Sequence, residues 1–186
     1  MELRILKGRE LLGSALAEQI LELDRRNMQH VLAEAGIGFP LEKRRKGLES
    51  DATFIVGFDG ETLAGYLDYL RSWTNPDYIY IGSVQIEKRY RGSSLLLLLL
   101  DRFRTLVAAE DFAGFETNVQ KVNVAAANLY RKIGFTLEPN PRNHASWTAR
   151  AGKSLLTDSP LATLLERHRA RRHLQGPVSS TEAHDR

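Results

Sequence analysis

The pattern of hydrophobic and polar residues predicts four strands in the first half of the chain, one before and three after a helical stretch. The predicted strands are residues 3–6, 53–58, 62–71 and 78–86. Apolar residues at helical spacing over residues 9–35 predict two helices with a break near Asp24. Asp59-Gly60 is a dipeptide typical of a β-hairpin turn, so the second and third strands should pair. The glycines of residues 36–50 and the charge run Lys43-Arg44-Arg45-Lys46 favour a surface loop or a frayed helix end.

The second half of the chain alternates between strand and helix patterns. Six leucines at residues 95–100 predict a helix covered on most of its circumference, since leucine favours helices and is not β-branched. Strands are expected at residues 112–119, 135–138 and 146–156, with a helix starting at Asn123. The segment between Gly92 and Asn123 is long enough for a right-handed crossover between parallel strands.

The chain changes character at Ser159. Residues 161–174 predict a basic helix, and residues 175–186 have the composition of a disordered tail. We therefore expect one domain over residues 1–156, followed by a basic helix and tail over residues 157–186. A chain of 186 residues, 42% of them hydrophobic, is long enough for one well-buried core and too short for two full domains.

Composition narrows the class of protein. No apolar run approaches the ~20 residues of a membrane span, and the polar start lacks the layout of a signal peptide, so we expect a soluble, cytoplasmic protein without a membrane partner. The absence of cysteine excludes disulfides, thiolate metal sites and a cysteine nucleophile. The five histidines have no metal-ligand spacing, and we expect no metal. The formal charge of +3 is modest and fits an anionic ligand without indicating nucleic-acid binding.

The helix that starts at Asn123 carries the first candidate site. Asn123 and Tyr130 are seven residues apart and therefore lie on the same helical face, two turns apart. Asn123 is also a good N-cap, and Gly134 is well placed to end the helix in a left-handed conformation. One ligand can therefore touch the amide and the phenol. An ordinary amphipathic helix with a buried tyrosine explains the same pattern.

The turn between residues 86 and 95 carries the second candidate site. A strand ends at Ile86, a basic turn with Gly92 follows, and the leucine helix begins directly afterwards. Free N–H groups and the positive end of the helix dipole favour an anion at such a helix start. Arg89 and Arg91 add positive charge, and Ser93 or Ser94 can cap the helix. A solvated basic loop is the alternative reading.

Together the two segments resemble the GNAT superfamily of acetyl-coenzyme A-dependent N-acetyltransferases. Arg89-Tyr90-Arg91-Gly92-Ser93-Ser94 is similar to the family's pyrophosphate-binding turn, and Val84-Gln85-Ile86 to the strand that holds the pantetheine arm and the acetyl carbonyl. The second signature is matched by Asn123, Ala126, Leu129, Tyr130, Lys132, Gly134 and Phe135. The motifs cover about residues 78–138. Position 94 is Ser where the family usually has Gly or Ala, and a small serine should be tolerated.

The resemblance implies a fold and a function. The fold would be a mixed, mostly antiparallel sheet of six to seven strands flanked by helices (α+β or α/β), with a parallel β-α-β unit at the cofactor site. The function would be transfer of the acetyl group of acetyl-coenzyme A to a primary amine within a ternary complex. Tyr130 would be the general acid, because a phenol of pKa ~10 can protonate a thiolate whose acid has a pKa of ~8.5. Val84, Gln85, Ile86, the six turn residues, Asn123 and Lys132 would contact the cofactor.

The base and the acceptor amine are open at this stage. Asp68 and Tyr80 are the chosen candidates for the base or for amine binding, and Tyr66, Asp77 and Glu116 are further ones. Asp68 draws attention as an acid inside an apolar strand, although a solvent-facing position explains it equally well. The acceptor can be a small molecule or a protein amine.

Two other functions compete with acetyl transfer. A non-catalytic acyl-coenzyme A sensor of the same fold would share the cofactor site and lack a productive acceptor pocket. A nucleic-acid-binding protein would use two basic runs, Lys43 to Lys46 and Arg167 to Arg172. These runs lack interleaved aromatic residues, so we do not expect nucleic-acid binding. A homodimer is possible, because a strand near the C-terminus can pair with a second copy.

Overall fold

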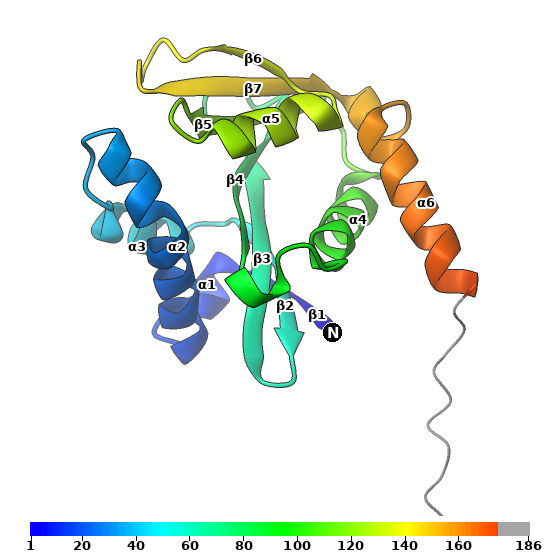
Figure 1. Ribbon diagram of the computed structural model, residues 1–186, viewed down its shortest axis with the longest axis horizontal. Helices are drawn as coiled ribbons and strands as arrows, with labels where there is room; N and C mark the ends of the chain where they lie inside the picture. The colour runs from blue at the N-terminus through cyan, green and yellow to red at the C-terminus, as the bar shows by residue number, and fades with distance from the viewer. Residues whose placement is uncertain (175–186) are drawn as a thin grey trace, which may run out of the picture.

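One seven-stranded sheet with helices on both faces forms the body of the protein in the computed structural model, which describes residues 1–174 (Figure 1). The strands are β1 (Glu2–Lys7), β2 (Thr53–Asp59), β3 (Thr62–Arg71), β4 (Tyr78–Ile86), β5 (Gly114–Gln120), β6 (Thr136–Pro139) and β7 (Ser146–Gly152). The helices are α1 (Gly8–Leu11), α2 (Ala15–Glu34), α3 (Leu41–Leu48), α4 (Leu95–Val107), α5 (Val124–Ile133) and α6 (Pro160–Leu174), with two 3₁₀ helices, η1 (Lys88–Tyr90) and η2 (Lys153–Leu156).

The sheet order is β1-β2-β3-β4-β5-β7-β6, and only the β4–β5 pair is parallel. The structure therefore confirms a mixed, mostly antiparallel sheet with one parallel β-α-β unit, β4–α4–β5. In Figure 1 the β7–β6 end of the sheet is turned steeply away from the direction of β3 and β4.

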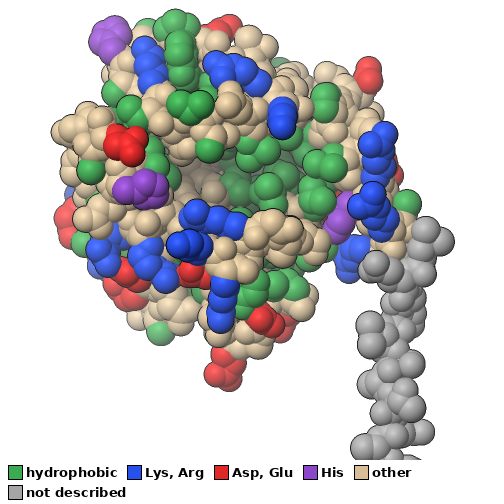
Figure 2. Space-filling view, viewed as in Figure 1, with side chains coloured by type: hydrophobic (Ala, Val, Ile, Leu, Met, Phe, Trp, Pro, Cys, Tyr) green, Lys and Arg blue, Asp and Glu red, His purple; other side chains and the backbone are tan. Residues whose placement is uncertain are grey.

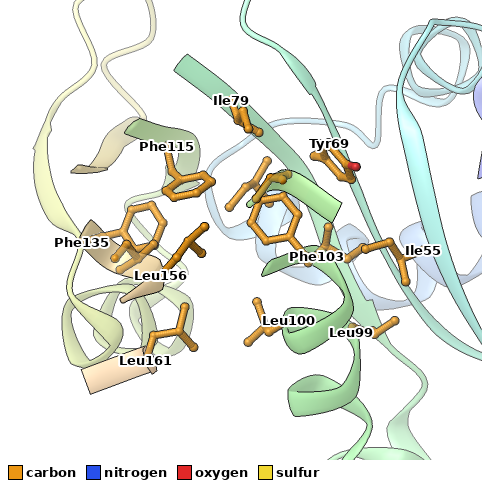
Figure 3. Close-up of a cluster of buried hydrophobic side chains, with 14 of the residues drawn as sticks. Ile55, Tyr69, Ile79, Leu99, Leu100, Phe103, Phe115, Phe135, Leu156 and Leu161 are labelled. Atoms are coloured by element: carbon orange, nitrogen blue, oxygen red, sulfur yellow. The ribbon is translucent and has the colours of Figure 1, made fainter. Parts of the chain in front are cut away.

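Side chains alternate between the two faces of the sheet, and each face has its own core. On one face, Phe54 and Tyr66 pack with Ile20 and Leu23 of α2. On the other face, α4, α5 and α6 cover a larger core that includes Ile55 and Phe115. Figure 3 shows Leu99, Leu100 and Phe103 of α4 among its labelled side chains, together with Ile79 and Tyr69 from the sheet.

The leucine run forms the buried side of α4. Leu95, Leu99, Phe103 and Val107 repeat at four-residue spacing and are nearly inaccessible, whereas residues 96–98 are half-buried. This arrangement confirms the prediction of a helix covered on most of its circumference.

The C-terminal helix α6 packs against α4 and α5. Leu161 and Leu165 are buried in the larger core, and Arg169 donates to Asp101 of α4 at 2.9 Å. The tail predicted for residues 175–186 lies outside the described residues. Within residues 1–174, no helix combines the length and apolar character needed to cross a membrane.

Two local predictions near the N-terminus were wrong. The break between the first helices lies at residues 12–14, because Gly13 has a φ of 66° and Ser14 caps α2 by accepting from the Ala17 N–H at 3.1 Å. Asp24 continues α2 instead of breaking it, since Tyr66 and Arg44 satisfy its carboxylate. The charge run at residues 43–46 lies inside α3, where Arg44 points into the protein and Arg45 pairs with Glu18.

Candidate active site

The sheet splits between β4 and β5. Their parallel pairing covers only three residue pairs and ends at Tyr80 opposite Glu116, although β4 runs on to Ile86 and β5 to Gln120. Beyond this point β4 pairs only with β3, and β5 only with β7, among residues 1–174. The backbone groups on the two inner edges are therefore available to a ligand inserted between the strands.

A bulge in the β3–β4 ladder lies beside this split. Asp68 pairs with Ser83 and Tyr69 with Ile81, so that Gly82 is the extra residue. A Cβ atom on Gly82 would lie 2.1 Å from Asp68 Oδ2, so only glycine leaves room for this carboxylate. The bulge disrupts the ladder locally and bends β4 near the end of its pairing with β5.

The turn after β4 has the backbone of an anion site. Gly92 has a φ of 82°, a left-handed conformation that favours glycine, and α4 begins three residues later. The first amide-to-carbonyl bond of α4 runs from Leu98 N to Ser94 O at 3.0 Å, which leaves the preceding N–H groups outside the helical pattern. Ser93 Oγ accepts from Leu95 N at 3.2 Å, whereas the Ser94 side chain makes no capping hydrogen bond.

Side chains of the turn are held by neighbouring elements. Arg89 lies over the Tyr90 ring at 4.7 Å, and Tyr90 donates to Asp59 at 2.7 Å. Arg91 donates to Asn27 Oδ1 of α2 at 2.6 Å. The Asn27 amide in turn donates to Gln85 Oε1 at 3.0 Å and to the Ile86 carbonyl at 3.1 Å. Asn27 therefore fixes both the end of β4 and one arginine of the turn.

An apolar hollow adjoins the turn. Half-buried hydrophobic residues pack along the margin of the larger core from β4, α4 and α5: Val84, Ile86, Leu96, Leu97, Ala126 and Tyr130. Figure 2 shows hydrophobic side chains gathered in a hollow on this face, with Lys and Arg side chains at its margin. An apolar passage that ends at a basic, glycine-containing turn suits an extended ligand with an anionic end.

Helix α5 presents Tyr130 to the split. Asn123 Oδ1 accepts from the Ala126 N–H at 3.1 Å and Gly134 ends the helix with a φ of 109°, so both caps are confirmed. The Tyr130 ring packs edge-to-face on Phe135 at 5.1 Å. Burial raises the pKa of Tyr130 to about 12, while the Thr117 hydroxyl acts in the opposite direction. The phenol is therefore neutral at pH 7. Lys132 is exposed in the last turn of α5.

A polar pocket of about 640 Å³ lies around the other side of the same split. Its lining comes from β4, β5 and β7, the β3–β4 loop, the β6–β7 loop and α3: Lys43, Ser72, Trp73, Thr74, Asn75, Tyr80, Glu116, Thr117, Asn118, Gln120, Asn140, Pro141, Arg142, Asn143, Ser146, Thr148 and Arg150. Thr117 lines this pocket and also influences the Tyr130 phenol. The two sites therefore meet where β4 and β5 separate.

Glu116 is the carboxylate of this pocket. It is 5% exposed and accepts hydrogen bonds from Ser72 Oγ and, at 3.1 Å, from Thr74 Oγ1. Arg150 Nε lies 3.5 Å from its other oxygen. Tyr80, its register partner on β4, accepts from the Asn118 amide at 3.2 Å, and burial raises the pKa of this phenol.

Asp68 lies outside this pocket, beside Arg44. Its carboxylate accepts from Arg44 at 2.9 Å, and Arg44 also donates to Asp24 at 2.5 Å and to Tyr66 at 2.7 Å. Burial raises the pKa of Asp68, and the Arg44 guanidinium acts against this rise. Asp68 and Tyr66 are buried and do not line the pocket, and Asp77 is exposed before β4.

The sequence of a known family matches the part of the chain that contains the split. A model described as the acetyltransferase (GNAT) family matches residues 17–135, which is more than half of the chain. The chain belongs to the GNAT acetyltransferase family. This finding confirms the predicted resemblance to the GNAT superfamily, and the matched range includes the turn and helix α5. No curated protein matches the chain by sequence at a significant level.

Solved GNAT-type structures are similar in fold and distant in sequence. The PaiA N-acetyltransferase of Thermoplasma acidophilum, in complex with coenzyme A, has 16% identity and a TM-score of 0.59 over 82% of this chain and 99% of that chain. A GNAT-family acetyltransferase of Staphylococcus aureus Mu50 has 14% identity and a TM-score of 0.62, covering 81% and 99%. An aminoglycoside 6'-acetyltransferase type Ii has 12% identity and a TM-score of 0.60, covering 82% and 97%.

Two parts of this GNAT site were missed by reasoning from the sequence. Asn27 is a polar residue one turn beyond the buried Leu23 of α2, and Arg44 belongs to a charge run that is typical of a surface. The partners of both lie at least 20 positions away in the chain, so no local pattern identifies them. A cofactor of the coenzyme A type fits the residues present, because the turn offers free N–H groups and the hollow is apolar.

Proposed function

We propose that this GNAT protein is an N-acetyltransferase that moves the acetyl group of acetyl-coenzyme A directly to a primary amine within a ternary complex. One observation carries the proposal: the split between β4 and β5 has a buried, neutral phenol on one side and a polar pocket with a buried carboxylate on the other. The family and the coenzyme A complex of a similar structure support the cofactor half.

The cofactor half follows from the turn and the open strand edge. Arg89 and Arg91, the Gly92 turn and the free N–H groups of α4 would hold the phosphates. The inner edge of β4, over Val84, Gln85 and Ile86, would hydrogen-bond the extended arm and the acetyl oxygen. Bound there, acetyl-coenzyme A supplies an acetyl group activated as a thioester. Lys132 would contact the same ligand. The side-chain N–H groups of Asn123, which take no part in the capping bond, would contact it as well.

The residues around the split would manage the protons of the reaction. The amine nitrogen forms a bond to the acetyl carbon, the carbon–sulfur bond breaks, and sulfur takes the phenol proton of Tyr130. The bound ammonium loses one proton before the attack and the nitrogen loses a second one afterwards; both leave through the polar pocket, and Tyr130 regains its proton from solvent. The pKa of about 12 keeps Tyr130 in the donating form at neutral pH.

Tyr80 and Glu116 would bind the amine. A lysine-like amine enters as an ammonium ion and deprotonating it at pH 7 costs about 4.6 kcal/mol, so the pocket must both bind the ammonium and let its proton leave. Tyr80 and Glu116 lie side by side where the strands part, and both line the pocket. The raised pKa of Tyr80 favours a hydrogen-bonding role over a base. Asp68 is held by Arg44 and would position the β4 bulge instead of touching the amine.

An amine screen tests this function. Purified protein is incubated with acetyl-coenzyme A and primary amines, free thiol is followed over time, and N-acetylated products are identified by mass. We expect thiol and N-acetyl product in equal amounts, and initial-rate plots that intersect because both substrates bind before transfer. Coenzyme A binding without acetylation of any small-molecule or protein amine would support the sensor instead. Parallel initial-rate plots would argue for an acetylated enzyme.

A matched pair of variants separates the pocket from the general charge of the surface. Glu116→Gln removes the pocket carboxylate, whereas Glu138→Gln removes an exposed carboxylate that pairs with the same Arg150. We expect Glu116→Gln to raise the KM for the amine at least ~10-fold, the worth of about one charge-assisted hydrogen bond. The Glu138→Gln variant should stay close to the parent, and equal effects would contradict the placement of the amine.

A further inference from the structure

The charges of the acceptor pocket are unequal. Its lining holds one carboxylate, Glu116, and three cationic side chains, Lys43, Arg142 and Arg150. The cations come from three different elements, namely α3, the β6–β7 loop and β7. The remaining polar lining is neutral and consists of amides and hydroxyls.

Only one of the three cations is compensated within residues 1–174. Arg150 lies 3.1 Å from Glu138 and 3.5 Å from Glu116, so two carboxylates neutralise it. Lys43 and Arg142 have no carboxylate oxygen within 4.0 Å among the described residues. Arg142 is held at its backbone by Asn140, whose side chain accepts from the Arg142 N–H at 2.9 Å.

The charges are also separated by depth. Glu116 is buried beside the split, where Tyr80 and the phenol of Tyr130 are close to the reacting atoms. Lys43 and Arg142 are exposed and belong to the outer rim. An acceptor that enters the pocket therefore meets a negative charge at its inner end and positive charges at its outer end.

We infer that the acceptor is a small primary amine that also carries a carboxylate, as an amino acid does. The amine lies at Glu116 and Tyr80, and the carboxylate faces Lys43 and Arg142. This inference rests on the proposed acetyl transfer and names its substrate class. The Trp73 ring lies next to Tyr80, with 5.2 Å between ring centroids and a tilt of 46°, and its exposed ring offers a flat surface to the apolar part of the acceptor.

The same charges disfavour polycationic acceptors. A polyamine that places one ammonium at Glu116 brings its second ammonium toward Lys43 and Arg142, and like charges at close range are unfavourable. A carboxylate in that position forms charge-assisted hydrogen bonds to both. The preference therefore arises from attraction for one class and repulsion of the other.

Matched pairs of amines test the inference. Each pair has the same side chain with and without the carboxylate: tyrosine and tyramine, tryptophan and tryptamine, ornithine and putrescine. Thiol release with acetyl-coenzyme A gives kcat/KM for each member at two salt concentrations. We expect the carboxylate-bearing member to be preferred by at least ~10-fold in every pair, and the preference to shrink at high salt.

Variants of the rim cations test whether these residues cause the preference for carboxylate-bearing amines. The double variant Lys43→Gln/Arg142→Gln should lower kcat/KM for tyrosine by more than for tyramine and reduce the ratio toward one. Lys46 lies on the same helix outside the pocket, so Lys46→Gln should leave the ratio of the two kcat/KM values unchanged.

The possible failures can be told apart. Equal or higher rates for the decarboxylated amines, or transfer confined to protein lysines or N-termini, would overturn this inference and leave acetyl transfer in place. Absence of transfer to every amine would overturn the proposed function and the inference with it.

Discussion

The cluster around Arg44 joins α2, α3 and β3, and its contribution to stability can be tested by substitution. Arg44 is the only cation within 4.0 Å of Asp24 and Asp68 in the described part of the chain, and the two carboxylate side chains are 3% and 4% exposed. Replacing Arg44 by Met keeps most of the stem and removes the charge. Breaking a buried ion pair in this way costs about 3–5 kcal/mol, because the remaining charge stays buried without a partner.

The neighbouring residue provides the control. Arg45 pairs with Glu18 at the surface, where an ion pair contributes about 0–1 kcal/mol. We therefore expect Arg44→Met to lower the free energy of unfolding, measured by urea denaturation at pH 7, by several times more than Arg45→Met. Converting both aspartates to Asn in the Arg44→Met background should restore part of the loss. Similar costs for the two arginine variants would refute the reasoning.

The loss of stability caused by Arg44→Met should depend on pH. Burial raises the pKa of Asp68 in the folded protein and Arg44 opposes this rise, so removing Arg44 raises the pKa further. A carboxyl group whose folded pKa is raised stabilises the protein below its unfolded pKa, and this contribution is lost as the pH rises through the folded value. The cost of Arg44→Met should therefore be larger at pH 8 than at pH 5. A constant or reversed difference would contradict this account.

Three further predictions concern the turn, the bulge and the phenol. Gly92→Ala and Gly36→Ala replace glycines at φ 82° and 70°, and each should lower the free energy of unfolding in urea by about 1–2 kcal/mol. Only Gly92→Ala should weaken coenzyme A binding in calorimetry. Equal affinities of the two variants for coenzyme A would contradict the phosphate site. Gly82→Ala forces a Cβ against Asp68 and should cost about 1–3 kcal/mol, so an unchanged melting temperature would count against the bulge geometry. Tyr130 has a pKa of about 12 when folded and of ~10 when unfolded, so the unfolded state ionises first. The parent should therefore lose about 1 kcal/mol of stability relative to Tyr130→Phe between pH 9 and pH 11, and a pH-independent difference would contradict the burial.

Features that depend on local chemistry could be predicted from the sequence. The hairpin at Asp59-Gly60, the cap at Asn123 and the left-handed end at Gly134 each depend on residues within a few positions of one another. The parallel unit followed from the length of the segment between Gly92 and Asn123. These local signals define the proposed cofactor side of the site.

The acceptor side depends on contacts between distant residues. Glu116 and Tyr80 are neighbours only because β5 is inserted between β4 and β7, and the sequence alone gave no reason to prefer Glu116 over Asp68. Arg44 lies in a run of four basic residues that is typical of a surface, and its buried partners are 20 to 24 positions away. Hydrophobic periodicity does not encode such pairings, so only the structure distinguishes the carboxylate that lines the pocket, Glu116, from the one that pairs with Arg44, Asp68.

The central claim is that Tyr130 protonates the leaving thiolate, and turnover of Tyr130→Phe tests it most directly. Free thiol is measured with acetyl-coenzyme A and an amine that the parent accepts, while calorimetry gives the affinity for coenzyme A. Tyr78→Phe serves as a control, since Tyr78 lies outside the pocket lining. The account predicts an affinity within about twofold of the parent and a kcat lower by about 10²–10⁴-fold. An unchanged kcat with normal coenzyme A binding would contradict it.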